Sequence, residues 1–312
     1  MIRSCYKFLL LFLILLIIVL IAFFVRISFV FIYLSLLQGV IEWLPISSSG
    51  TVMIVAINFF GISPEEAFSL AIWLHLGTAF AVILKFRTDF VEISKACFPQ
   101  IFGEPEEIIR KKRNWLIRAT IGTAITALPL YFLFKIILIG AFTAFQGDII
   151  TLIISGLLII TGVILLKSKK IYGEKDLTEA NKKEIKKDSM LSGLVQGISI
   201  LPGISRSGIT VSAILLKNYD QDTGLRMSFL MSVPVVFASI IVDFIFGEGS
   251  VFGILDPLTI IVVTIVSFVV GYVSIEVLLK LAQKVNFGYF CIIYGIIAFA
   301  LIFPLLLISI VS

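Results

Sequence analysis

Histidine, cysteine and charged residues are all scarce in this sequence of 312 residues. His75 is the single histidine, which excludes a metal site built from several imidazoles. Any bound ion must then be held by carboxylate, phosphate or water, which favours a hard divalent cation such as Mg²⁺ or Ca²⁺. Cys5, Cys97 and Cys291 stand apart, without the paired spacing that a zinc site or a disulfide framework requires.

Charge is low enough to indicate the class of protein. Charged residues make up 14% of the chain and hydrophobic residues 59%, whereas soluble globular proteins have roughly 25% charged and about 45–50% apolar residues. Apolar windows of about 20 residues, the length that crosses a bilayer, recur from end to end. The sequence therefore predicts an all-α, polytopic integral membrane protein of the cell membrane, with the lipid bilayer as its environment. The basic residues lie in connectors without a nucleic-acid motif, so we expect no nucleic-acid partner.

The first 26 residues resemble a signal peptide, because Arg3 and Lys7 precede an apolar run. That run is longer than the apolar region of a signal peptide and lacks a cleavage site of small residues. We therefore expect a retained N-terminal hydrophobic helix over residues 1–26.

Two later stretches share one plan. Residues 38–51 read QGVIEWLPISSSGT and residues 196–210 read QGISILPGISRSGIT, and their Gln-Gly pairs and Ser-x-Ser-Gly runs are offset by the same 158 positions. Each stretch contains a proline, which cannot continue a helix. Irregular backbone is tolerated at membrane depth only when it is buried in protein or lines a wet cavity. We therefore expect two re-entrant helix hairpins, over residues 27–61 and 190–217.

In the first hairpin we expect one helix to end at Pro45 and a second to begin at Ser48 and stop at Gly61. Full transmembrane helices should follow each hairpin, at about 66–86, 114–139 and 148–167, and at about 225–247, 257–280 and 288–311. The chain then divides into repeat 1 (27–167), a basic cytoplasmic connector (168–189) and repeat 2 (190–312). Because three crossings, an odd number, separate the hairpins, repeat 2 must enter from the opposite face, which is an inverted-topology repeat.

The distribution of charge indicates an orientation. In this topology 22 of the 25 lysines and arginines fall on one side. The positive-inside rule makes that side cytoplasmic. The N-terminus is then cytoplasmic, the C-terminus outside, and the two hairpins dip from opposite faces so that their tips meet near the midplane. Asp243 lies close to the outer end of its helix, and we expect it to be solvated or to snorkel toward the membrane surface.

Glu42 and Arg206 are charges inside the two hairpins, where an ionised residue costs at least ~2.5–3.5 kcal/mol. One interpretation is that they pair with each other and only lock the hairpins together. The other is that Arg206 and the positive ends of two helices form a site for phosphate or diphosphate. Ser47 and Ser48 would then offer hydroxyl nucleophiles, and Glu42 a general base or a ligand for a divalent ion. Serines at helix starts are more often caps than nucleophiles, so spacing alone leaves both roles open.

These motifs carry a resemblance. Gln38-x-x-x-Glu42 followed by Leu-Pro-x-Ser-Ser-x-Gly, with Pro202-Gly-x-Ser-Arg-Ser-Gly-x-Thr210 later, resembles the two signature motifs of the undecaprenyl-diphosphate phosphatases, also called bacitracin-resistance proteins. The resemblance covers about residues 30–311. It implies a membrane hydrolase that converts a polyprenyl diphosphate to the monophosphate carrier lipid and phosphate, with inverted repeats, a divalent cation and a site toward the outer face.

The resemblance also implies roles for individual residues. Ser48 would be the nucleophile with Ser47 as its neighbour, and Gln38 and Glu42 would occupy the positions of the acidic motif. Arg206 would form the diphosphate clamp together with three hydroxyl residues, Ser205, Ser207 and Thr210.

Two departures from the family pattern affect this mechanism. The family commonly has glutamate where this chain has Gln38, which leaves Glu42 as the one carboxylate. It usually has histidine where this chain has Thr51. His75 could replace that imidazole from the next helix, although a lone histidine on an apolar helix is more often a packed one. Otherwise Glu42 serves alone, or a metal-bound water attacks.

Two functions thus compete at this stage. One is hydrolysis of a polyprenyl diphosphate, and the other is a transporter or flippase that carries an anionic polyprenyl-phosphate lipid with the same inverted repeat. Both need an anion site between the repeats, so the sequence does not separate them. Whether the chain forms a homodimer is left open.

Overall fold

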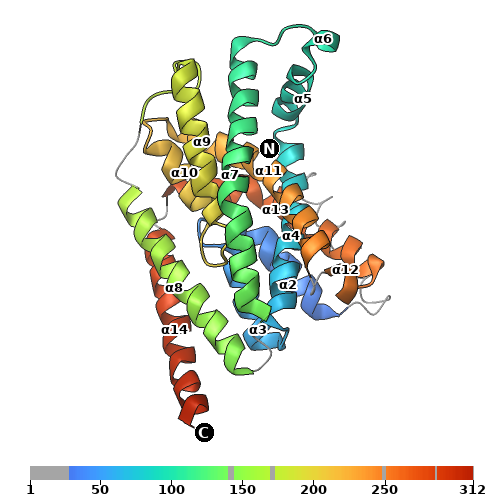
Figure 1. Cartoon of the computed structure of the whole chain (residues 1–312), viewed down its shortest axis with the longest axis vertical. Coiled ribbons are helices and arrows are strands. Elements are labelled where there is room, and N and C mark those ends of the chain that lie inside the picture. The colour runs from blue at the N-terminus through green and yellow to red at the C-terminus, as the bar shows by residue number, and fades with distance from the viewer. Residues whose placement is uncertain (1–27, 140–143, 169–172, 248–250, 285–286, 312) are drawn as a thin grey trace, which may run out of the picture.

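The computed structural model describes residues 28–139, 144–168, 173–247, 251–284 and 287–311. Within these ranges the regular structure is helical, apart from an isolated bridge between Lys175 and Tyr219. The predicted all-α class is therefore confirmed (Figure 1). The N-terminal helix expected over residues 1–26 lies outside the described residues.

The described helices follow one order twice: a short broken pair and then long helices. The first half contains α2 (Phe29–Ile41), α3 (Ser48–Phe60), α4 (Pro64–Lys85), α5 (Arg87–Ala96), α6 (Pro99–Phe102), α7 (Glu107–Ile139) and α8 (Ala144–Ser168). The second half contains α9 (Lys182–Ile198), α10 (Arg206–Leu215), α11 (Gln221–Phe246), α12 (Val251–Ile254), α13 (Pro257–Lys284) and α14 (Phe287–Val311).

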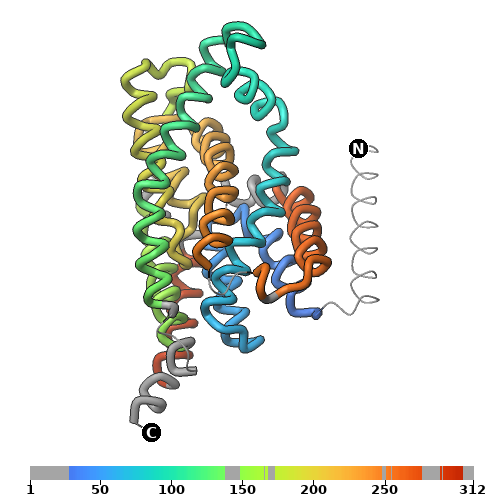
Figure 2. Tube along the Cα trace, turned by 45° about the vertical axis from the view of Figure 1, so that its right-hand side comes forward, coloured from blue at the N-terminus to red at the C-terminus, as the bar shows by residue number. Residues whose placement is uncertain are grey.

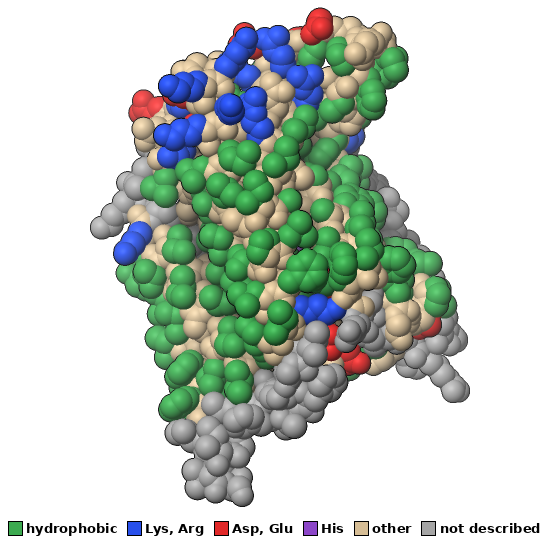
Figure 3. Space-filling model, in the orientation of Figure 1, with side chains coloured by type: hydrophobic (Ala, Val, Ile, Leu, Met, Phe, Trp, Pro, Cys, Tyr) green, Lys and Arg blue, Asp and Glu red, His purple; other side chains and the backbone are tan. Residues whose placement is uncertain are grey.

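Length and hydropathy identify which of these helices could cross a membrane. In the described part of the chain four stretches are long and apolar enough to cross a bilayer, namely Pro64–Lys85, Glu107–Ile137, Gln221–Phe246 and Pro257–Ile275. Hydrophobic side chains cover the middle of the molecule, while lysine and arginine gather at the end where α7 begins (Figure 3). The chain is thus a polytopic membrane protein, as its composition predicts.

In each hairpin one helix boundary differs from the prediction. The first hairpin helix ends at Ile41 rather than at Pro45, because a proline ring clashes with the carbonyl four residues earlier, and that carbonyl belongs to Ile41. In the second hairpin the helix begins at Lys182, inside the segment predicted as a connector. There the Asn181 side chain accepts from the Glu184 N–H while Glu184 accepts from the Asn181 N–H, a capping box that starts the helix early.

Helices of each half pack against helices of the other half. Helix α7 of the first half packs along α9 of the second, and α13 of the second half packs along α2 of the first (Figures 1 and 2). Helix α4 contacts α11, and α8 contacts α14. Reciprocal packing of this kind is expected of two related halves, whereas their inverted orientation and the predicted domain boundaries stay predictions.

Glycine allows these pairs of helices from different halves, α7 with α9 and α2 with α13, to approach closely. A Cβ at Gly193 of α9 would lie 2.2 Å from the Ala119 carbonyl oxygen of α7, and a Cβ at Gly39 of α2 would lie 2.8 Å from Val270 of α13. Small residues serve this purpose in membranes, where helix association depends on close packing.

Asp243 does not have the solvated environment expected for it. Its side chain lies at 7% exposure and accepts hydrogen bonds from Ser69 Oγ (2.5 Å) and Tyr131 OH (3.1 Å). The prediction was wrong because the partners come from α4 and α7, which are distant in sequence from α11. Asp243 therefore ties three helices together away from the hairpin tips.

Candidate active site at the two hairpin tips

The tips of the two hairpins touch through Ser47 and Gly203. The Gly203 N–H donates to Ser47 Oγ at 3.0 Å. A Cβ at Gly50 would lie only 2.6 Å from the nitrogen of Gly203, so the tips meet backbone to backbone. Gly203 also has φ +101°, which glycine adopts without a steric penalty. The turn of the second tip therefore needs glycine at position 203, and the contact between the tips needs glycine at position 50.

Each new helix is capped by a serine. Ser47 accepts from the Gly50 N–H (3.3 Å) at the start of α3, and Ser205 accepts from the Gly208 N–H (3.2 Å) at the start of α10. Ser47 has φ 60°, an uncommon conformation for a residue with a side chain. Because Ser47 supplies the cap, Ser48 is the first residue of α3 and its hydroxyl is released from capping.

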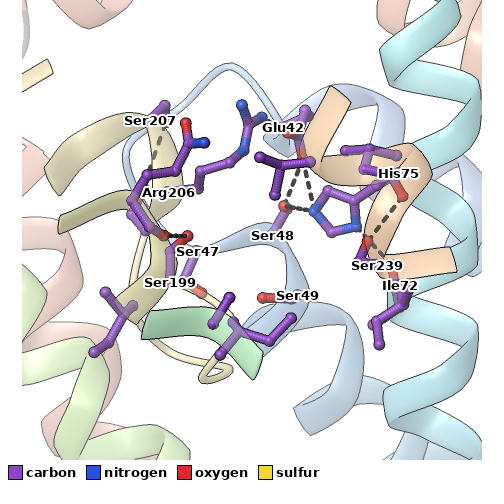
Figure 4. Close-up of a pocket in the computed structure, with 18 of the residues that line it drawn as sticks. Glu42, Ser47, Ser48, Ser49, Ile72, His75, Ser199, Arg206, Ser207 and Ser239 are labelled. Carbon is purple, nitrogen blue, oxygen red and sulfur yellow. Dashed lines mark hydrogen bonds and ion pairs between the residues drawn. The ribbon is translucent and has the colours of Figure 1, made fainter. Parts of the chain in front are cut away.

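The Ser48 hydroxyl lies between two bases. Its Oγ donates to Glu42 Oε2 at 2.6 Å and lies 3.2 Å from His75 Nε2. Figure 4 shows these three side chains facing one another from the end of α2, the start of α3 and the middle of α4. A hydroxyl within hydrogen-bond reach of a base has the geometry of an activated nucleophile. The tertiary structure thus favours the nucleophile interpretation of Ser48 over the capping interpretation.

His75 belongs to this group, although its sequence context favours a packed residue. Its Nδ1 lies 2.6 Å from the Ala71 carbonyl oxygen. A carbonyl can only accept, so Nδ1 carries a proton and Nε2 is the nitrogen that faces the site. Nε2 is 3.2 Å from Glu42 Oε2 as well as from Ser48. An imidazole is therefore present beside the serine, from α4 rather than from position 51.

Glu42 and Arg206 form a direct ion pair between Oε1 and Nη2. This is the pairing that the first interpretation of the two charges anticipates. The ion pair leaves two nitrogens of the guanidinium without a partner, because Arg206 Nε and Nη1 are buried and make no hydrogen bond to the described residues. Leaving buried donors unpaired is costly, and Arg206 lines a cavity. The guanidinium thus holds Glu42 and still offers two donors to a ligand.

Gln38 supports Glu42 from one turn earlier on α2. Its Nε2 donates to Glu42 Oε2 at 2.7 Å, and the side chain is fully buried. Its Oε1 and the hydroxyl of Thr210 have no partner among the described residues. Neither Gln38 nor Thr210 lines the cavity, whereas the other six predicted site residues do: Glu42, Ser47, Ser48, Ser205, Arg206 and Ser207.

The cavity between the tips has a volume of about 80 Å³. Its lining includes the six predicted residues together with His75 and Gln196, and apolar side chains such as Phe68, Ile72 and Val236. A lining that combines polar and apolar side chains suits a ligand with a polar head and an apolar tail.

A divalent cation fits this site only in part. Within the described residues no group of three or more His, Cys, Asp or Glu side chains could hold a metal ion. Glu42 and the unpartnered Oε1 of Gln38 are oxygen donors of the kind that Mg²⁺ or Ca²⁺ prefers. Magnesium is usually held by one or two carboxylates plus substrate phosphates, so Glu42, which lines the cavity, fits a cation that binds together with a diphosphate.

The fold and this site define a polytopic helical membrane protein with a serine, a histidine and an ion pair gathered at two helix breaks. A family model described as "Bacitracin resistance protein BacA" matches residues 31–300. The chain belongs to this family.

Curated relatives cover a similar share of the chain. A protein named undecaprenyl-diphosphatase from Methanothrix thermoacetophila is 38% identical over 274 residues, which are 86% of this chain and 94% of that protein. A protein of the same name from Haloarcula marismortui is 35% identical, over 85% of this chain and 94% of that protein. Another from Halothermothrix orenii is 32% identical, over 86% of this chain and 95% of that protein.

Proposed function

We propose that this protein hydrolyses the terminal phosphate of undecaprenyl diphosphate, or of another long polyprenyl diphosphate, to give the monophosphate carrier lipid and inorganic phosphate. Membership of the BacA family and the names of the relatives support this reaction. The observation that carries it is the Ser48 hydroxyl, 2.6 Å from Glu42 and 3.2 Å from His75, beside the unpartnered donors of Arg206.

In this proposal the head group lies against the polar side chains of the cavity and the prenyl tail against its apolar side chains. Arg206 Nε and Nη1 donate to phosphate oxygens, which they do more specifically than an ammonium would because the guanidinium is planar. Ser205 and Ser207 lie beside Arg206 at the start of α10, where the positive end of the helix also favours the anion.

The serine then acts as the nucleophile. Ser48 Oγ attacks the terminal phosphorus, and its proton passes to Glu42 or to His75. The bond from this phosphorus to the bridging oxygen breaks, and the prenyl monophosphate leaves with that oxygen and the electron pair. Water, deprotonated by the same bases, hydrolyses the phosphoserine and restores the hydroxyl.

A divalent cation, Mg²⁺ or Ca²⁺, is part of the proposal. Glu42 would hold it, and when bound it supplies positive charge against the diphosphate oxygens. The second candidate, transport of an anionic polyprenyl lipid, needs an anion site but no hydroxyl between two bases. The position of Ser48 therefore favours hydrolysis.

The experiment is release of inorganic phosphate from a polyprenyl diphosphate by the purified protein with a divalent ion. We expect release from the wild-type protein and its loss in Glu42→Gln, Ser48→Ala and Arg206→Ala. Release no greater than in a protein-free control would reject the enzyme, whereas release that persists in a Glu42→Gln/Arg206→Ala double variant would reject this site.

The orientation of the protein in the membrane is also part of the proposal, and it rests on the distribution of charge. The basic end faces the cytoplasm, the two repeats are inverted, and the site opens toward the outer face. The uneven distribution of lysine and arginine supports this orientation. A C-terminal tag should therefore be accessible from outside, and accessibility only from the cytoplasm would contradict the orientation. The mass of the protein in detergent tests whether it is a monomer or a homodimer.

A further inference from the structure

A second cavity, of about 270 Å³, lies at the basic end of the molecule between α7 and α9. Figure 3 shows lysine and arginine side chains gathered over this end. The cavity contains four basic side chains and one carboxylate, and its lining consists of Glu107, Arg110, Lys111, Asn114, Arg118, Lys182 and Ile185. It shares no residue with the cavity between the hairpin tips.

The two arginines in this cavity have no hydrogen-bond or ion-pair partner among the described residues. Lys111 Nζ donates to the Thr178 carbonyl oxygen at 2.5 Å and lies 3.5 Å from Glu107. In contrast, Arg110 and Arg118 are half-buried, and the described residues give neither guanidinium a hydrogen bond or an ion pair. The cavity therefore holds two forked donor groups that are free to bind an anion.

The cavity forms where α7 and α9 stop packing closely. Deeper in the molecule Gly122 and Gly193 bring the helices into backbone contact, because a Cβ at either glycine would lie within 3 Å of the other helix. Toward the basic end the facing residues become long, and Arg110, Asn114 and Arg118 follow one another at one-turn spacing on α7. The opening between the helices is therefore lined by one charged face of α7.

Apolar surface begins directly below Arg118. Ile117, Ile121 and Ile125 recur at one-turn spacing on α7 and are 49%, 50% and 57% exposed. Ile121 and Ile125 lie three and seven positions after Arg118, which places them on its side of the helix. Arg118 thus marks the boundary between charged and exposed apolar surface on α7.

We propose that the cavity binds the phosphate head group of an anionic phospholipid, with the acyl chains along the exposed isoleucines of α7. Basic pockets between membrane helices recognise such head groups, and each basic residue near an anionic surface adds attraction. A planar guanidinium binds two phosphate oxygens at once. The exposed isoleucines beside the cavity favour a lipid over free phosphate, because acyl chains can pack against them and a soluble ion cannot.

The test measures the unfolding temperature of the full-length protein in detergent, with phosphatidylglycerol, phosphatidylcholine or inorganic phosphate added. We expect phosphatidylglycerol to raise this temperature and phosphatidylcholine and inorganic phosphate to leave it unchanged. In Arg110→Gln/Arg118→Gln the apparent affinity for phosphatidylglycerol should fall on the order of tenfold or more. The single variants Arg110→Gln and Arg118→Gln should each show a smaller fall, and they replace the double variant if it does not fold.

The matched control is Lys183→Gln/Lys187→Gln, which also removes two positive charges near the start of α9 but leaves the cavity lining intact. It should bind phosphatidylglycerol as the wild type does. An equal loss of affinity for phosphatidylglycerol in the lysine control would show that only the total charge of the protein matters, and it would overturn the proposed site. Stabilisation by inorganic phosphate that depends on the two arginines would overturn the assignment to a lipid.

Discussion

Glu42 and Arg206 lie 164 residues apart in the sequence and form an ion pair at the junction of the two hairpins. The Glu42 side chain is 3% exposed and that of Arg206 14%. Each hairpin supplies one charge, so neither charge is neutralised until both halves of the chain have folded together. Two guanidinium nitrogens remain unpartnered within the described residues, so the same contact holds the fold together and prepares an anion site.

Arg206→Gln should destabilise the protein by ~3–5 kcal/mol, because it leaves the Glu42 carboxylate buried without its counter-charge. The Glu42→Gln/Arg206→Gln double variant should regain most of that loss, since no isolated charge remains. Thermal unfolding in detergent measures both. A double variant no more stable than Arg206→Gln would show that the pair is not coupled in this way.

Ser48→Ala should reduce phosphate release by a factor on the order of 10³ or more, because the nucleophile is lost while binding is kept. Stopped reactions of the wild type should contain phosphoserine at position 48. The exposed Ser94 of α5 offers the control, and Ser94→Ala should keep full activity. Unchanged turnover in Ser48→Ala would mean that water attacks directly.

His75→Gln should lower kcat by ~10²–10⁴ with little change in KM, as expected for loss of a group that moves a proton. The substitution keeps the size and polarity of the side chain. A merely packed histidine would instead change stability and leave the turnover number alone. Measuring kcat, KM and the unfolding temperature together separates the two roles.

Gly50→Ala should separate the hairpin tips. The new Cβ would lie 2.6 Å from the nitrogen and 2.8 Å from the Cα of Gly203, and overpacking of this kind costs ~1–3 kcal/mol. We expect lower thermal stability and a loss of phosphate release, because Ser48 and Arg206 are moved apart. Gly156→Ala on α8 is the matched control, since nothing lies within 4 Å of its added Cβ. Equal effects of the two substitutions would argue against the contact.

Chelation of divalent ions should stop phosphate release, and added Mg²⁺ or Ca²⁺ should restore it. The unfolding temperature should change little, because Arg206 and Gln38 hold Glu42 without a metal. Full activity in excess chelator would remove the cation from the mechanism. A large drop in stability would instead indicate a structural ion.

Much of the fold follows from local sequence. Length and hydropathy predict the long helices, and the Ser47 to Gly61 segment predicts α3 with its serine cap and its glycine stop, as observed. Proline ends α2, although one turn earlier than expected, because the clash falls on the carbonyl of Ile41. These features depend on neighbours within one or two turns, which a sequence displays directly.

The site itself divides between sequence and tertiary structure. The two repeated motifs identify Glu42, Ser48 and Arg206, because charges and serines are rare within apolar helices. The sequence leaves His75 open between a packed residue and a replacement imidazole, and the packing of α4 beside the first hairpin brings its Nε2 to 3.2 Å from Ser48. The burial of Asp243 likewise depends on α4 and α7. Local sequence determines where helices begin, break and carry polar groups, whereas contacts between distant helices decide which of those groups meet.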